Sequence, residues 1–120
     1  MDKIIFNLKR FWLLPADYHT GETSKIVNLY EEIKAGRKTS EWRNFSPYWQ
    51  RRLLFCSGLK ALSKKPIDCT KDLKSSKAWF VVGYPKGNLP RLEADIVGLI
   101  YHPQSEQFEI KFANVREIIA

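Results

Sequence analysis

The sequence predicts an α+β domain in which a small curled sheet or mixed barrel carries helices on one side. Three observations lead to this prediction. Residues 4–8 alternate as an early strand with one strongly apolar face, two helical patterns follow between residues 23 and 55, and residues 78–112 read as a run of antiparallel strands. With 120 residues and 44% hydrophobic content the chain can bury one core, so we expect a single domain over residues 1–120.

The first half of the chain is predicted to alternate strand and helix. Pro15 ends the pattern of the strand at residues 4–8, and Thr23 or Ser24 can cap the helix that follows. Gly36 closes this helix, because glycine readily takes the left-handed conformation of a C-terminal cap. The apolar positions that recur at helical spacing are Ile26, Leu29, Tyr30 and Ile33.

A second helix is predicted after a turn and a strand at residues 37–43. Ser46 supplies a capping hydroxyl and Pro47 suits the first helical position, so the helix should run over residues 48–55. The side chains on its core-facing side would be Trp49, Leu53 and Leu54. Residues 57–77 are polar and lysine-rich, and we interpret them as a loop with at most one weak turn of helix.

The C-terminal third changes to strand patterns. Residues 78–84 form an apolar and aromatic strand, and residues 85–88 carry a turn signal. A second strand at residues 92–101 is connected through a hairpin at residues 102–105 to a third at residues 108–112. As large aromatic side chains, three tryptophans are assigned to the core: Trp42, Trp49 and Trp79.

The positive charge of the chain is concentrated in its central third. The net charge is +7, and residues 34–65 carry nine basic residues against Glu41 alone, or +8. Residues 1–33 sum to −1 and residues 66–120 to 0. Such a concentrated basic region suggests a polyanionic partner, most simply nucleic acid. The alternative is a surface that only aids solubility.

Several classes of protein are disfavoured by the sequence. No apolar run is long enough to span a bilayer, and charges interrupt the first residues, unlike a signal peptide. Cys56 and Cys69 do not make a disulfide framework, and we interpret them as reduced thiols of a cytoplasmic protein. His19 and His102 have no partners at ligand spacing, so no zinc site is expected. Neither a phosphate-cradling glycine loop nor a nucleophile elbow is present, and no cofactor is expected.

The most specific chemistry lies at residues 36–43, which read Gly-Arg-Lys-Thr-Ser-Glu-Trp-Arg. Glu41 and Arg43 are two apart, so on a strand they share a face. Arg43 could then pair with Glu41 or grip a phosphate in bidentate fashion. Lys38 joins them only if the turn after Gly36 reorients it, since three residues along a regular strand reverse the face. The alternative is an exposed strand with ion pairs of little energetic value.

This segment matches the pattern G-x-K-x-x-E-x-R and thereby resembles the signature of the ASCH superfamily. The context is similar too, with an early strand, a helix ending at the glycine and a later strand carrying Gly83 and Tyr84. Residues 46–53 resemble the version found in small, phage-type members. The resemblance covers nearly the whole chain. It implies a PUA-like mixed β-barrel flanked by helices, with a cleft lined by the signature residues, that binds or processes RNA or modified nucleosides.

The leading hypothesis is a domain that binds RNA or a nucleotide-like ligand in that cleft. Tyr84 at a strand end could stack on a base, although it could equally be a packing residue at the barrel end, and Lys86 could reach a phosphate. The signature residues expected to line the cleft are Lys38, Glu41 and Arg43, and Arg37 beside them is expected to help bind the ligand through its charge. The residues expected to attract the polyanion are Arg51, Arg52, Lys64 and Lys65.

The second hypothesis is a hydrolase, either a ribonuclease or an amidohydrolase of acylated nucleosides. Lys38 would act as the base and Glu41 as a proton shuttle. The resembling amidohydrolases have a threonine at the position of Glu41 and a separate glutamate, for which Glu93 and Asp95 are candidate substitutes. A third interpretation is a protein-interaction module, of phage or mobile-element origin, whose basic face meets an acidic protein.

Overall fold

A long hairpin of two strands forms the centre of the main sheet. The computed structural model describes residues 3–8, 11–14, 25–55, 65–82 and 90–119. In it, β7 (Pro90–His102) and β8 (Gln107–Ile119) pair antiparallel over nearly their whole length. The alternation that predicted strands in this part of the sequence is therefore confirmed, and both strands extend beyond the predicted bounds because the pairing continues on either side.

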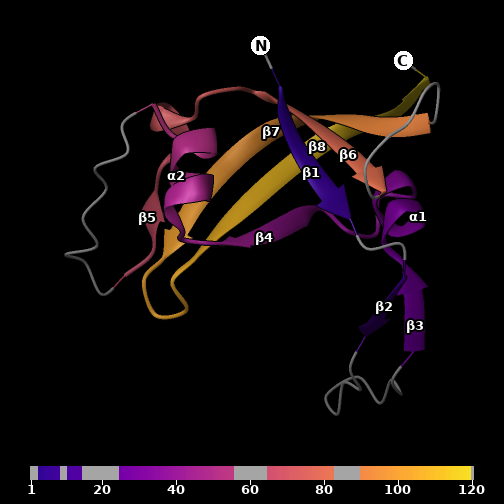
Figure 1. The fold of residues 1–120 in the computed structure, drawn as a ribbon, viewed down its shortest axis with the longest axis horizontal. Coiled ribbons are helices and arrows are strands. Elements are labelled where there is room, and N and C mark those ends of the chain that lie inside the picture. Colours follow the sequence, from indigo (N-terminus) through magenta and orange to yellow (C-terminus); the bar gives the residue numbers. More distant parts are fainter. Residues whose placement is uncertain (1–2, 9–10, 15–24, 56–64, 83–89, 120) are drawn as a thin grey trace.

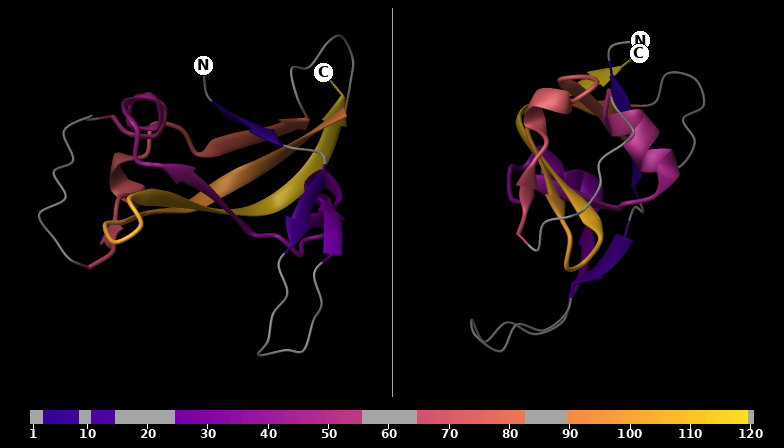
Figure 2. Two further views of the ribbon diagram at one scale, coloured as in Figure 1. Left: turned by 60° about the horizontal axis from the view of Figure 1, so that its bottom comes forward. Right: turned by 90° about the vertical axis from the view of Figure 1, so that its left-hand side faces the viewer.

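Four further strands complete this sheet. Its order is β1 (Ile4–Leu8), β6 (Lys77–Val82), β7, β8 and β4 (Ser40–Asn44), and the short β5 (Ile67–Asp68) also pairs with β7. β1 runs parallel to β6, whereas the other pairs are antiparallel, so the sheet is mixed. β1 and β4 are thus the two edges of the path. The sheet curls into a half-barrel (Figures 1 and 2).

The curl coincides with two irregularities in the β7–β8 hairpin. The register shifts between Ile96 and Gly98, where β7 holds an extra residue, and between Glu93 and Asp95, where β8 does. Asn114 lies in the second irregularity with φ 56°. An extra residue in one strand bends it and increases the local twist. The side chains on the inner face accordingly change from even to odd positions along β7: Leu92, Ala94 and Ile96, then Leu99 and Tyr101.

Two short helices and a separate hairpin complete the described part. α1 (Leu29–Lys34) and α2 (Pro47–Leu53) lie at opposite ends of the main sheet, while β2 (Phe11–Leu14) and β3 (Lys25–Asn28) pair as a hairpin that extends away from it (Figures 1 and 2). The predicted α+β class is confirmed.

The first predicted helix is only half right. Residues 25–28 form β3, and the helix begins at Leu29, capped by Asn28, whose Oδ1 accepts a hydrogen bond from the Glu31 N–H at 3.3 Å. Ile26 and Val27 suit a strand because they are β-branched, and pairing with β2 prevails over their helical spacing. The alternative caps Thr23 and Ser24 lie outside the described residues.

The second helix begins as predicted and ends early. Ser46 caps α2 by accepting from the Trp49 N–H at 3.3 Å, with Pro47 at the first helical position. The helix stops at Leu53 because Leu54 is extended and bridges to Leu73. In the loop predicted over residues 57–77, the described part contains β5 and a 3₁₀ turn at Thr70–Asp72.

The core fills the concave side of the sheet. Phe6 is fully buried, with its ring centroid 5.3 Å from Trp49 and 5.5 Å from Phe80. Trp49 is half-buried against this core. The assignment of Trp42 to the core is wrong, since it is 38% exposed on the outer face, opposite Glu109 of β8. Trp79 is half-buried on the outer face, because its neighbours on both sides along β6 point inward.

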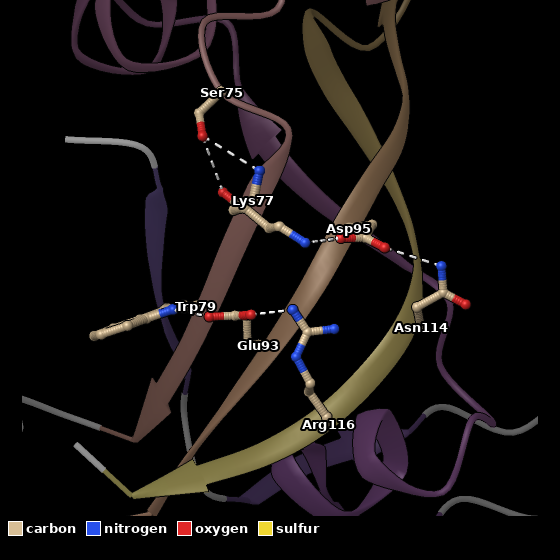
Figure 3. Close-up of polar contacts among 7 residues, drawn as sticks. All are labelled: Ser75, Lys77, Trp79, Glu93, Asp95, Asn114 and Arg116. Carbon is tan, nitrogen blue, oxygen red and sulfur yellow. Dashed lines mark hydrogen bonds and ion pairs between the residues drawn. The ribbon is translucent and has the colours of Figure 1, made fainter.

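A polar network on the outer face ties β6, β7 and β8 together where the register shifts (Figure 3). Asp95 pairs with Lys77 and accepts from Asn114 Nδ2 at 2.9 Å. Glu93 pairs with Arg116 and accepts from Trp79 Nε1 at 3.0 Å. Each carboxylate therefore joins its own strand to both neighbouring strands.

These contacts predict a loss of stability in acid. Hydrogen bonds from Lys77 and Asn114 lower the pKa of Asp95, and those from Trp79 and Arg116 lower the pKa of Glu93. Their contribution is therefore fully present above the ordinary carboxyl pKa of about 4 and disappears as the pH falls through the lowered folded pKa. We expect the urea midpoint of the wild type to exceed that of a Glu93→Gln/Asp95→Asn variant at pH 7, and the gap to close toward about pH 3. A gap that stays constant over this range would contradict the assignment.

Candidate functional site

The turn at Gly36 brings Lys38 toward β4. Gly36 has φ 80°, and its N–H donates to the Ile33 carbonyl at 3.1 Å, while the Arg37 N–H donates to the Glu32 carbonyl at 3.0 Å. This pair of bonds is the Schellman ending of a helix, which requires a residue that tolerates positive φ. The Lys38 N–H also donates to the Glu32 carbonyl, at 3.1 Å, so the turn is held through Lys38.

The structure brings together the side chains of Lys38, Glu41 and Arg43, which is the arrangement that a binding site in this segment requires. We call these residues the Lys38–Glu41–Arg43 cluster. Glu41 Oε1 lies 3.6 Å from Lys38 Nζ and 3.0 Å from Arg43 Nη1. Glu41 pairs with Ile110 and Arg43 with Phe108, both of which are buried, so the two side chains lie on the inner face of the sheet. The side chain of Lys38 remains 25% exposed and connects the cluster to solvent.

Among the described residues, Glu41 is the charged residue that is buried, with 8% of its surface exposed. Its Oε1 also accepts a hydrogen bond from the Trp42 N–H at 3.2 Å. Its Oε2 is buried and has no hydrogen-bond partner among the described residues. A buried acceptor without a donor is costly and uncommon, so this oxygen is suited to receive a donor from outside the chain.

Arg43 joins the two edges of the sheet. Its Nη2 donates to the Asn7 carbonyl of β1 at 3.2 Å, and its Nη1 donates to the Trp42 carbonyl of β4 at 2.8 Å. The guanidinium carbon lies 5.3 Å from the ring centroids of both Phe6 and Trp49. Because both terminal nitrogens are engaged, a phosphate that bound end-on to the two of them would compete with these contacts.

Glu41 and Arg43 also protect the free edge of β4. The odd-numbered residues of β4 bond to β8, so the backbone groups of Trp42 point away from it, toward the open edge. Glu41 accepts from the Trp42 N–H and Arg43 donates to its carbonyl. Satisfying these groups with side chains denies them to another strand. The pair therefore has a structural role whether or not a ligand binds.

The remaining predicted site residues are dispersed. Arg37 pairs with Glu32 of α1, Nε to Oε2 at 2.6 Å, and points away into solvent. Arg51 and Arg52 are exposed on α2, and Lys65 is exposed. Three other predicted site residues, Tyr84, Lys86 and Lys64, lie outside the described residues.

The two carboxylates proposed to assist Glu41 do not reach it. Glu93 pairs with Trp79 and Asp95 with Lys77 across the β6–β7 ladder, which places both on the outer face, whereas Glu41 is on the inner face. Both carboxylates are already engaged in the network of Figure 3. The suggestion that they substitute for a second catalytic carboxylate is therefore wrong.

Sequence reasoning missed the aromatic surroundings of the cluster. The sequence places Phe6 on a strand with one apolar face and predicts a core position for Trp49, and nothing local in it indicates that their rings flank Arg43. Tyr48 and Arg52 are also in contact, with the guanidinium carbon 4.3 Å from the ring centroid. Their i, i+4 spacing on a predicted helix was a usable signal, since such residues are neighbours on its surface.

Neither a metal nor a membrane site emerges from the described residues. No group of three or more His, Cys, Asp or Glu side chains in the described ranges is arranged to hold a metal ion. None of the helices in the same ranges has the length and apolar character needed to cross a membrane. Comparisons of the chain with family models, with curated proteins and with solved structures found no significant match.

Proposed function

We propose that this chain is a PUA-like domain of the ASCH type that binds RNA or a nucleotide-like ligand at the Lys38–Glu41–Arg43 cluster. The observation that carries the proposal is the buried Glu41 Oε2, which has no donor within the described chain. Nucleobases present N–H and NH₂ donors on their edges, and an acceptor in a site of this kind reads them.

The charge around this oxygen suits a ligand that also carries a phosphate. Lys38 Nζ lies 3.6 Å from Glu41 Oε1 and is partly exposed, so it can contact an anion while a base approaches the carboxylate. The central third of the chain supplies the net positive charge that would attract a polyanion. A base donor at Glu41 and a phosphate at Lys38 together describe a nucleotide.

Hydrolysis by the same cluster is the second candidate, because an amine and a carboxylate lie side by side at Lys38 and Glu41. These are the parts of an acid–base pair. Binding is the stronger proposal, since Glu93 and Asp95 face the other side of the sheet and leave Glu41 without the carboxylate expected for deacylation.

Fluorescence anisotropy with labelled single-stranded RNA tests binding. About three phosphate contacts would lower the affinity roughly 20-fold between about 50 and 200 mM salt, because each neutralised phosphate releases counterions. Lys38→Ala should weaken binding several-fold, and Glu41→Gln should do so by at least tenfold, since the amide presents a donor where the ligand needs an acceptor.

Lys111→Ala is the matched control, because Lys111 is exposed on the opposite face of β8 and its loss changes the net charge equally. Equal losses in Lys38→Ala and Lys111→Ala, or a flat salt response, would overturn the proposed site. The same samples are incubated with RNA and with acylated cytidine. Turnover that disappears in Lys38→Ala and Glu41→Ala but persists in Lys111→Ala would replace binding by hydrolysis.

A further inference from the structure

α2 presents an aromatic ring to solvent in a fixed orientation. Tyr48 is 48% exposed, so part of its aromatic ring is accessible to a partner. The Arg52 guanidinium lies 4.3 Å from its ring centroid, and the Trp49 ring meets it edge-on at 5.2 Å with an interplanar angle of 86°. The neighbours therefore orient the ring without burying it. This lowers the entropic cost of fixing the Tyr48 side chain when a base stacks on it.

This ring is connected to the Lys38–Glu41–Arg43 cluster through direct contacts. Trp49 touches Tyr48 on one side and stacks on Phe6 on the other, with ring centroids 5.3 Å apart and planes 9° apart. The Arg43 guanidinium lies 5.3 Å from Trp49 and pairs with Glu41 at 3.0 Å. Direct contacts therefore lead from Tyr48, which is exposed to solvent, through Trp49 and Arg43 to the buried Glu41.

The helix that carries Tyr48 is basic. α2 contains Arg51 and Arg52 in its last turn and no acidic residue. Lys74 adds a third cation, since its Nζ donates to the Arg51 carbonyl at 3.2 Å. An exposed ring among cations is the combination that single-strand-binding proteins use, in which the cations follow the phosphates and the ring stacks on a base.

We propose that the surface of Tyr48, Arg51, Arg52 and Lys74 binds single-stranded RNA by stacking an unpaired base on Tyr48. This inference rests on the proposed function and extends it from a nucleotide at Glu41 to a strand that continues over α2. A duplex does not fit the proposal, because its bases are stacked on one another and offer no free face to a ring.

The test compares Tyr48→Ala with Tyr48→Phe, which keeps the ring and loses only the hydroxyl. We expect Tyr48→Ala to weaken the binding of a short unstructured RNA roughly tenfold, Tyr48→Phe to bind like the wild type, and a duplex of equal length to bind more weakly than the single strand. Because Tyr48 is half exposed, both variants should fold, which circular dichroism verifies. In an NMR titration, the affinity for cytidine monophosphate should be the same in Tyr48→Ala and the wild type, since that ligand reaches only the cluster.

The outcomes separate this inference from the proposed function. If the wild type binds neither RNA nor cytidine monophosphate, the proposed function and the stacking surface are both overturned. Unchanged RNA affinity in Tyr48→Ala, or equal affinity for duplex and single strand, overturns the stacking surface and leaves the cluster standing. Displacement of the RNA by polyglutamate as readily as by unlabelled RNA also overturns it, because the surface would then attract any polyanion, acidic proteins included.

Discussion

Replacing Arg43 by alanine should destabilise the fold by about 3 kcal/mol, because the buried carboxylate of Glu41 loses its nearer cation. Glu41 would retain the hydrogen bond from the Trp42 N–H and one described cation, Lys38, which is farther away at 3.6 Å and partly exposed. The Asn7 and Trp42 carbonyls would lose the Arg43 donor, and the rings of Phe6 and Trp49 would lose their contact with its guanidinium. Urea unfolding followed by tryptophan fluorescence measures the loss.

A double variant separates the ion pair from the other contacts of Arg43. Adding Glu41→Gln to Arg43→Ala removes the stranded carboxylate, so the double variant should be more stable than Arg43→Ala alone. Arg51→Ala is the control for loss of an exposed arginine and should change the stability by no more than about 0.5 kcal/mol. A double variant less stable than Arg43→Ala would show that the charge of Glu41 is not what Arg43 compensates.

Truncation of Phe6 should have a larger effect, about 4 kcal/mol, because a fully buried aromatic ring leaves a cavity that its neighbours fill only in part. Its ring is packed against Trp49 of α2 and Phe80 of β6. Phe6→Ala therefore loosens β1 and α2 together. Thermal or urea unfolding measures the loss, and Trp49 fluorescence should shift toward that of an exposed indole.

The adjacent residue supplies the control for Phe6. Asn7→Ala removes an exposed side chain and keeps the backbone carbonyl that Arg43 uses, so its stability should stay within about 0.5 kcal/mol of the wild type. Comparable losses of unfolding free energy in Phe6→Ala and Asn7→Ala would contradict this prediction. They would mean that the packing of Phe6 in the core is not what holds β1 in place.

The parts of the fold that were predictable are those with local signals. Residues 4–8 and 108–112 show a period of two in their side chains, and Ser46 with Pro47 encodes a helix start; all three predictions hold. The helix predicted from residue 23 failed at its beginning, because Ile26 fits a strand and a helix equally well. Pairing with β2 decides between them, and no local pattern reports that pairing.

The site was predictable to the same extent. Period two placed Glu41 and Arg43 on one face, but that face could be identified as the inner one only from the pairing with β8. The Arg43–Asn7 contact joins residues 36 apart in sequence and depends on the curl of the whole sheet. The same holds for Glu93, whose outward direction follows from the registers of β6 and β8 with β7. Such facts belong to the tertiary structure and have no local signature.

The parallel pairing of β1 with β6 joins segments that are far apart in the sequence. Ile4–Leu8 have their ladder partners at residues 78–82, and the Asn7 carbonyl has its donor at Arg43. The β7–β8 hairpin, by contrast, joins neighbouring segments and can form early, because closing a short loop loses less entropy than closing a long one. During synthesis the apolar side chains of β1 therefore have no ladder partner until residues 78–82 have been made. Over that interval, the strand that carries Phe6 exposes apolar side chains that favour aggregation.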